Sequence, residues 1–415
     1  KMLYDNGQLV SLYSDAYLIN KNELYKETVY NTLEFIEREL LHENGGFYAS
    51  LDADSMNEEN ELEEGAFYVW KKEELEKIIG SEFELFSQYY NINEYGFWEN
   101  NAYNLIRSKA DDEFAILNNI EITDLKKIVD QWKNKLLVER AKRQPPRLDD
   151  KILTSWNALM LKGYIDAYRV FNDNHFLDIA LKNASFLEEN IIKNDGSLFR
   201  SYKNKKATIN AYLEDYATLI EAYISLYEVS LEDKWVLLAK KLSDYTFEHF
   251  YDKDSNMFFF TSDIDSKLIT KKTELEDNVI PSSNSIMAKN LTKLGHFFED
   301  ANYLKTSRQM VHNIAPLIEN YPSSYSNWLD IYTHLSGSFY ELAIVGKDAI
   351  QKIKEVNKHY IPNKVICGRV SDIKNKSFSE NEAEFPLLKN RFIQGSTMIY
   401  VCVNNSCNFP TNDSS

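Results

Sequence analysis

Acidic side chains occur in pairs at three points of the chain where helices are predicted to begin or end. The first pair, Asp52 and Asp54, falls in a loop that follows a predicted helical hairpin. Two carboxylates about 5–10 Å apart can hydrolyse a glycosidic bond when one is protonated and the other ionised. The alternative is a solvated loop, because residues 54–64 contain six acidic side chains. We therefore keep Asp52 and Asp54 as candidate catalytic residues.

The second pair, Asp149 and Asp150, directly precedes a strongly periodic helical segment. An aspartate at this point can cap the helix, which is worth about 1 kcal/mol. It can also remain ionised for catalysis, since the first turn of a helix carries partial positive charge. Trp156, one turn along, could stack on a sugar ring, and Asn157 beside it could bind the substrate. Both interpretations stay open.

Two further polar clusters begin the next helices of this type. Tyr212, Glu214 and Asp215 form one, with Glu214 and Asp215 as acid–base candidates and Tyr212 as a second stacking platform. Ser283 and Asn284 form the other and are candidates for substrate binding. Acids, serine and asparagine also suit a first turn for structural reasons alone. The recurrence of such clusters at equivalent points is what favours a site.

The recurrence itself indicates a repeated unit of helix, helix and extended loop. Three segments share a Tyr-x-x-x-Tyr pair on an apolar period of 3.6, and two degraded copies follow from Ser283 and near Trp328. Repeated hairpins must stack to bury their apolar faces, either as an open solenoid or as a ring. We expect the tyrosines to line the inside of a closed toroid, with ordinary core packing as the alternative. The pairs are Tyr13/Tyr17, Tyr164/Tyr168 and Tyr223/Tyr227.

Two segments depart from this pattern. Residues 66–143 are expected to carry their own helices, near 73–79, 83–90 and 125–140. From Phe339 onward, short apolar runs predict strands at 342–346, 365–367 and 398–403, a helix at 348–358 and a polar loop at 370–384. The predicted domains are therefore a helical toroid over 1–338 and a small α/β segment over 339–415.

Bulk composition excludes several classes of function. The net charge is 47 − 64 = −17, which disfavours nucleic acid, polyanionic substrates and anionic membranes. Only 13 glycines and 8 prolines in 415 residues favour long helices. No run approaches the roughly 20 apolar residues of a membrane span, and the N-terminus does not resemble a signal peptide. No phosphate loop or nucleophile elbow is present, so no cofactor is indicated.

The three cysteines, Cys367, Cys402 and Cys407, are too few for a disulfide framework. We expect buried thiols in a cytoplasmic protein. A metal site that combines them with His359 is the weaker alternative, and no metal is predicted.

Several strings of residues, in order along nearly the whole chain, resemble the thioredoxin-domain-containing proteins related to the spermatogenesis-associated protein of animals. They are Lys1–Asn6, Gly45–Tyr48 with Asp52–Ser55, Glu64–Trp70, Asp149–Lys151 with Ser155–Asn157, Leu213–Tyr216, Pro281–Ser285, and Tyr400–Cys402 with Cys407.

The resemblance implies a mainly α fold, an (α/α) six-hairpin toroid like those of glycosidases and N-acylglucosamine 2-epimerases. It also implies a thioredoxin-like domain N-terminal to this segment, which would be a partner. The toroid would then be incomplete at its N-terminus and should expose an apolar seam that promotes association. Because the family has no settled activity, the resemblance predicts the fold and not the reaction.

Two functional hypotheses follow. One is a carbohydrate-recognising domain with a sugar ligand, which could process glycosides through the paired carboxylates. The other is a non-catalytic scaffold that docks the thioredoxin-like domain and its protein clients. Epimerases of this toroid class use histidines that face the cavity, and here only His296 and His334 are tolerable candidates.

Overall fold

The computed structural model describes all residues except 58, 267–268, 372–384, 405 and 415. The chain forms two compact units: one comprises Lys1 and Ser50–Asp149, and the other comprises Met2–Ala49 and Asp150–Ser415. Each is described by itself below. The predicted boundary between residues 338 and 339 remains a prediction.

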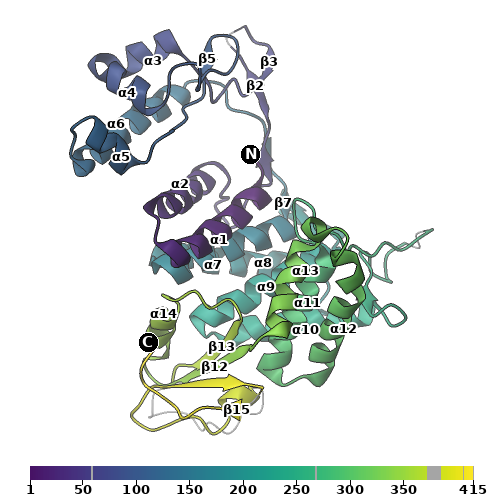
Figure 1. The fold of residues 1–415 in the computed structure, drawn as a ribbon. Helices are drawn as coiled ribbons and strands as arrows, with labels where there is room; N and C mark the ends of the chain where they lie inside the picture. The colour runs from purple at the N-terminus through teal and green to yellow at the C-terminus, as the bar shows by residue number, and fades with distance from the viewer. Residues whose placement is uncertain (58, 267–268, 372–384, 405, 415) are drawn as a thin grey trace. The chain divides into compact units, whose positions relative to one another are not determined.

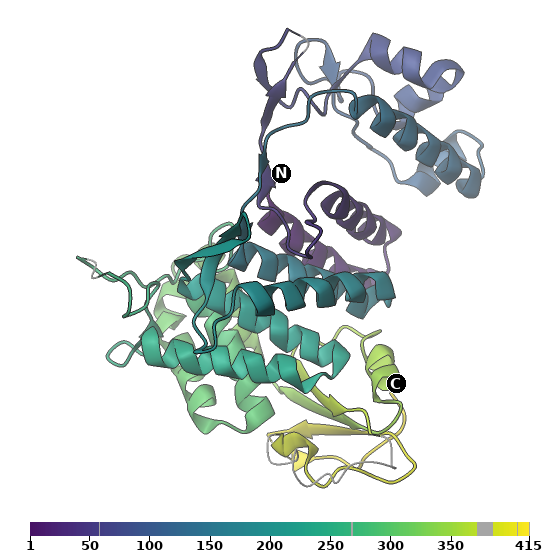
Figure 2. The same ribbon diagram turned by 180° about the vertical axis from the view of Figure 1, so that it is seen from behind.

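Helical hairpins build most of the larger unit (Figure 1). Within each hairpin the two helices pack together, and the first helix also packs on the first helix of the next hairpin. These first helices, here called the inner helices, succeed one another from α1 through α7, α9 and α11 to α13 (Figures 1 and 2). The hairpins are α1 (Leu3–Asn20) with α2 (Glu23–Glu39), α7 (Thr154–Phe171) with α8 (Asn174–Asn190), α9 (Leu213–Ser230) with α10 (Asp233–His249), and α11 (Ser283–Phe298) with α12 (Ala301–Ile318); α13 spans Ser326–Ser336. The prediction of a mainly α fold of repeated hairpins is confirmed.

The inner helices α7, α9 and α11 bury more surface than the second helices do. The second helices bury a single stripe, as in α8, where Phe176, Ala180, Ala184 and Leu187 recur at helical spacing. The inner helix α9 is instead buried along most of its length. This contrast is typical of a layer of helices that is covered on both faces.

The repeated tyrosines do not line a central space, so that prediction is wrong. Tyr164 and Tyr223 are fully buried between inner and outer helices. The Tyr164 ring stacks on Phe47, 5.6 Å away, and the Tyr223 ring packs against Trp235 at 5.3 Å. Their helical spacing reflects ordinary core packing, which was the alternative.

Each hairpin is followed by a return loop that the next inner helix holds by hydrogen bonds. The Asn157 amide accepts from the Phe47 N–H at 2.7 Å and donates to its carbonyl at 3.0 Å. The Asn284 amide holds Phe258 in the same way, at 2.9 Å for both bonds. The Tyr216 hydroxyl accepts from the Leu198 N–H at 2.9 Å. The first turns of α7, α9 and α11 are therefore each tied to the loop of the preceding hairpin.

Left-handed residues shape these return loops, as the glycines and asparagine in their sequences predict. Gly45 and Gly196 have φ values of 97° and 93°, and Asn256 has a φ of 56°. They lie in the turn after the outer helix and not at its last residue, which is a small correction to the prediction that they end a helix.

The C-terminal segment forms a four-stranded sheet in the order β13-β12-β14-β15. β12 (Tyr340–Val345) pairs in parallel with β13 (Lys364–Arg369) and antiparallel with β14 (Met398–Val403). The other elements are α14 (Ala349–Val356) and β15 (Ser406–Cys407). The predicted strands and helix are confirmed, whereas residues 372–384 of the predicted loop lie outside the described residues.

One cysteine prediction is wrong. Cys402 and Cys407 form a disulfide between β14 and β15, and only Cys367 is a buried free thiol. Their adjacent positions on two antiparallel strands bring the sulfurs together, a pairing that the spacing in sequence did not reveal.

The smaller unit has its own core around Trp132 and Phe86. Its helices are α3 (Lys72–Ile79), α4 (Phe83–Tyr89), α5 (Asp111–Leu117) and α6 (Ile122–Arg140), which confirms the three that were predicted. Short strand pairs complete it: β1 (Ser50–Leu51) with β6 (Leu148–Asp149), β2 (Asp54–Met56) with β3 (Leu62–Glu64), and β4 (Trp70–Lys71) with β5 (Ala102–Tyr103).

Helix α1 carries an exposed apolar stripe of Leu9, Leu12 and Ile19, which are 45%, 62% and 65% exposed. The expected apolar seam is therefore present on the first inner helix. In the part of the chain that the structure describes, no helix combines the length and apolar character needed to cross a membrane.

Two glycines allow α1 and α7 to approach closely. A Cβ at Gly7 would lie 2.7 Å from the Leu159 carbonyl oxygen, and one at Gly163 would lie 2.9 Å from the Gly7 carbonyl oxygen. Both neighbours are backbone atoms, so they cannot turn away.

We predict that Gly7→Ala lowers the free energy of unfolding by about 2–3 kcal/mol, because the added methyl group forces the two helices apart. Gly337→Ala is the matched control, since its Cβ would meet only ordinary contact at 3.6 Å. Chemical unfolding of both variants checks this, and equal stability of the two would contradict the packing described here.

Candidate functional site

The inner helices enclose a cavity of about 250 Å³ in the larger unit. This volume is just below the range of about 300–1,000 Å³ that is usual for small-molecule sites. The wall is formed by the middle and C-terminal halves of the five inner helices and by residues 357–366. Its charged and histidine residues are Asp15, Lys162, Asp166, Arg169, Glu221, Glu228, Lys289, Lys293, Asp330, His334 and Lys364.

Most of these charges are neutralised in pairs along and between the inner helices. Asp166 accepts from Lys162 at 2.6 Å and from Arg169 at 3.2 Å, and Arg169 also pairs with Asp15 of α1. Burial acts to raise the pKa of Asp166, but the two cations outweigh it and hold this pKa at about 2. Asp166 is therefore ionised at neutral pH and serves as a fixed acceptor.

A second set of pairs joins α11 to its neighbours. Lys293 lies 2.8 Å from the Glu228 carboxylate, which also accepts from the Ile366 N–H of β13 at 3.1 Å. Lys289 pairs with Asp330 of α13. Burial opposes the ionisation of Asp330, but the Lys289 ammonium prevails and lowers the pKa of the carboxyl.

Lys364, at the start of β13, has no such partner. Its ammonium donates to the Ile361 carbonyl at 3.0 Å, and no carboxylate of the described residues lies within 4 Å of it. Burial is the main cause that lowers the pKa of Lys364 to about 8, and the positive charges of Arg169 and Lys293 add to it. A half-buried amine that loses its proton near neutral pH is a typical feature of functional sites.

His334 of α13 also lacks a carboxylate at hydrogen-bond distance. Its Nε2 is buried without a hydrogen bond in the described structure and lies 3.6 Å from Asp330 Oδ1. Burial lowers the pKa of His334, an effect that Asp330 only partly offsets. The imidazole is thus favoured in its neutral form, which can accept a proton. His296, the other candidate histidine, pairs with Glu341 at 2.7 Å and does not line the cavity.

The cavity therefore combines two kinds of group. The ion-paired side chains present fixed donors and acceptors that suit a ligand with many hydroxyl groups. Lys364, with a pKa of about 8, can change protonation state near neutral pH, and the neutral imidazole of His334 can accept a proton. Tyr360, an aromatic residue, lies on the same wall.

None of the residues predicted from the sequence as catalytic or substrate-binding lines this cavity. The structure places the predicted Glu214 and Asp215 of α9 beside Ser155 of α7, a residue that was not predicted for the site. Ser155 donates its hydroxyl to Glu214 at 2.6 Å, and its N–H to Asp215 at 3.0 Å. Tyr212 caps α9, and Asp215 accepts from the Tyr212 N–H at 3.0 Å.

Asp215 is completely buried and pairs with Arg200 at 3.0 Å. Burial is the main cause that raises the pKa of Asp215 to about 6, against the opposing charge of Arg200. Its two backbone hydrogen bonds link the first turns of adjacent inner helices, so this cluster has an evident role in helix packing. Catalytic use of Glu214 and Asp215 remains a prediction.

Asn157 and Asn284 hold the return loops, and Ser283 donates its N–H to Glu274 at 3.1 Å. The buried side-chain amides of Asn157 and Asn284 bind backbone groups of the protein, whereas the prediction was that they bind a substrate. Trp156 packs edge-on against Tyr4 at 4.8 Å between ring centroids.

The remaining aspartates make contacts of other kinds. Asp150 pairs with Lys203 at 2.6 Å. Asp52, Asp54 and Asp149 belong to the smaller unit. There Asp52 pairs with Arg147 at 2.8 Å, Asp54 lies opposite Glu64 in β2–β3, and Asp149 lies in β6.

The charged residues of the cavity were missed, although the sequence contains a signal for them. Lys162, Asp166 and Arg169 recur at i, i+4 and i+7 within a helix that is otherwise apolar. Glu221 and Glu228 on α9, and Lys289 and Lys293 on α11, follow the same spacing. Charges on one stripe of a buried helix predict a polar interior.

The comparison with known proteins supports the predicted family resemblance. The chain matches no protein-family model. It is 27% identical to human spermatogenesis-associated protein 20 and 26% identical to the mouse protein, in each case over all of this chain and 56% of the relative.

The chain is a relative of spermatogenesis-associated protein 20. An uncharacterised Caenorhabditis elegans protein, B0495.5, is 29% identical over 78% of this chain and 48% of its own length. The chain thus spans about half the length of the curated relatives it matches.

Solved structures resemble this one only loosely. A sugar epimerase from a ruminal bacterium aligns with a TM-score of 0.47 and 14% identity, over 76% of this chain and 60% of the other. The GH76 α-mannanase BT2949 of Bacteroides thetaiotaomicron aligns with a TM-score of 0.46 and 11% identity, over 86% and 74%. These likenesses concern the fold alone.

We predict that Lys364→Met raises the stability of the folded chain at pH 7. A folded pKa of about 8 against an ordinary 10.5 means that the folded state disfavours the ammonium. Keeping Lys364 charged in the folded state at pH 7 therefore lowers the free energy of unfolding by about 2 kcal/mol, a figure reduced because the side chain is partly exposed. Wild-type stability should therefore rise as the pH increases from about 8 to 10.5, and the gain in the variant should shrink over that range.

Chemical unfolding at pH 7 and pH 10 measures this difference. Lys347→Met, at an exposed lysine of the same segment, is the control and should change stability by less than about 0.5 kcal/mol at both values. A Lys364→Met variant that is no more stable than the wild type at pH 7 would show that the ammonium is well accommodated.

Proposed function

We propose that the cavity binds a small carbohydrate and that His334 and Lys364 transfer protons to and from it. The observation that carries this proposal is that neither group has a carboxylate at hydrogen-bond distance among the described residues. Lys364 donates to the Ile361 carbonyl at 3.0 Å, and His334 Nε2 is buried without a hydrogen bond, 3.6 Å from Asp330. A buried group without a partner destabilises the fold, so it calls for a functional explanation.

The chemistry of the wall favours a sugar over an apolar ligand. Both acidic and basic side chains line the cavity; the acidic ones can accept from a hydroxyl group and the basic ones can donate to it. Tyr360 supplies a face on which a pyranose ring can stack. A strongly charged anion is disfavoured, because nearly every cation already has a carboxylate partner.

The predicted mechanism with paired carboxylates finds less support in this cavity. Glycoside hydrolysis needs one protonated carboxyl group. Asp166, with a pKa of about 2, and Asp330, whose pKa is also lowered, are both ionised at neutral pH. Proton transfer next to a sugar carbonyl, with His334 as base and Lys364 as acid, is the reaction class we propose.

The scaffold hypothesis remains the second proposal. The exposed stripe of Leu9, Leu12 and Ile19 on α1 favours it, because such a surface suits contact with another folded segment. The thioredoxin-like domain expected from the resemblance would be the partner. Disruption of the stripe should then abolish docking without any effect on sugar binding.

The first proposal can be tested with a panel of mono- and disaccharides. Calorimetry measures whether each sugar binds, and exchange of sugar C–H protons for deuterium in D₂O measures proton transfer. We expect one sugar to bind and to exchange. Lys364→Met and His334→Gln should each lower the exchange rate at least about 100-fold, while Lys347→Met should not. Absence of binding by every sugar, or equal exchange in all three variants, would contradict the proposal.

A further inference from the structure

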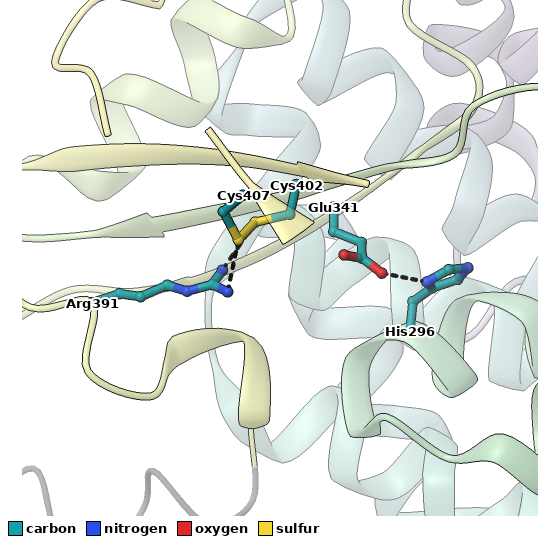
Figure 3. The surroundings of a disulfide bond; sticks show 5 residues. All are labelled: His296, Glu341, Arg391, Cys402 and Cys407. Atoms are coloured by element: carbon teal, nitrogen blue, oxygen red, sulfur yellow. Dashed lines mark hydrogen bonds and ion pairs between the residues drawn. A yellow bond between two sulfur atoms is a disulfide. The ribbon is translucent and has the colours of Figure 1, made fainter. Parts of the chain in front are cut away.

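The C-terminal hairpin contains a disulfide whose two sulfurs both face one guanidinium group. Arg391 donates from Nη1 to Cys402 Sγ at 3.3 Å and from Nη2 to Cys407 Sγ at 3.0 Å (Figure 3). Disulfide sulfurs are weak acceptors, whereas thiolates accept charge-assisted hydrogen bonds strongly. The contact is therefore worth more after reduction than before it.

The surroundings leave this guanidinium available to the sulfurs. No carboxylate of the described residues forms an ion pair with Arg391, and the nearby Glu341 carboxylate is held by His296 at 2.7 Å (Figure 3). The Arg391 backbone is fixed by a hydrogen bond from the Tyr400 hydroxyl to its carbonyl, at 2.8 Å.

The two sulfurs differ in access, which sets the direction of attack. Cys402 is completely buried, whereas Cys407 is exposed on β15. An external thiolate can therefore reach Cys407, and Cys402 is the leaving group beside Arg391.

Stabilisation of the fold is a poor explanation for the Cys402–Cys407 disulfide. The two cysteines are only five residues apart and already face each other across a strand pair. Closing so short a loop removes little entropy from the unfolded chain, so the bond adds less stability than one that closes a long loop.

We propose that Cys402–Cys407 is a reversible thiol–disulfide exchange site that takes two electrons from a dithiol reductant. A thiolate of the reductant attacks Cys407 Sγ, the S–S bond breaks, and Cys402 leaves as a thiolate stabilised by Arg391 Nη1. The second thiolate of the reductant then attacks the reductant's other sulfur, which is bonded to Cys407 in the mixed disulfide, and releases Cys407 as a thiolate. The chain gains two thiols after protonation, and the reductant becomes a disulfide.

Cys367 provides an internal control in the same segment. It is completely buried, and burial raises the pKa of this thiol to about 12. Low thiolate content and low access make it unreactive in the folded chain.

The test uses the whole chain in glutathione buffers of graded ratio, with dithiothreitol as the dithiol probe for rates. Alkylation and peptide mapping measure the reduced fraction of each cysteine, and circular dichroism follows the fold. We expect Cys402 and Cys407 to become reduced together while the chain stays folded and Cys367 stays unlabelled. Arg391→Ala should slow reduction about tenfold and shift the balance toward the disulfide, because the thiolates lose their donor.

Arg391→Lys should restore part of the rate, and Lys389→Ala, at an exposed lysine two residues away, should leave it unchanged. The proposal is wrong if the pair resists reduction until the chain unfolds, or if it fails to form a bond in oxidised glutathione. It is equally wrong if Arg391→Ala and Lys389→Ala have the same rate as the wild type.

Discussion

The architecture of the larger unit depends on the hydrogen bonds by which each inner helix holds the preceding return loop. Phe47, Leu198 and Phe258 are fully buried, so their backbone groups need partners inside the protein. Asn157, Tyr216 and Asn284 supply those partners from the first turns of α7, α9 and α11. The first three hairpins therefore return to the same end of the layer before the next inner helix begins. The inner helices run parallel as a consequence, and their C-terminal halves gather around one cavity.

This arrangement places many charges where water is scarce. Pairing between neighbours offsets most of the desolvation cost, as Asp166 shows with Lys162 and Arg169. Lys364 and His334 are exceptions, and both have pKa values lowered by burial. These two groups lower the stability of the fold at the point where five helices and a strand converge, and locally reduced stability is common at binding and catalytic sites.

Much of the fold could be predicted, because helical periodicity and turn residues are local signals. The hairpins, the strand β14 and the left-handed Gly45 and Gly196 all follow from the sequence. The site could not be placed in this way. A first-turn asparagine has the same sequence signature whether it binds a ligand or, like Asn157, a loop that is 110 residues away. Lys364 lies in the C-terminal segment, and only the tertiary fold brings it beside Arg169 and Lys293.

The most direct test of the account is a crystal structure of the chain soaked with the sugar that binds best. We expect density for one sugar inside the cavity, in contact with Lys364 and His334 and against the Tyr360 ring. Density beside Glu214 and Asp215 at the starts of α7 and α9, with the cavity unchanged, would contradict it and would favour the paired carboxylates instead.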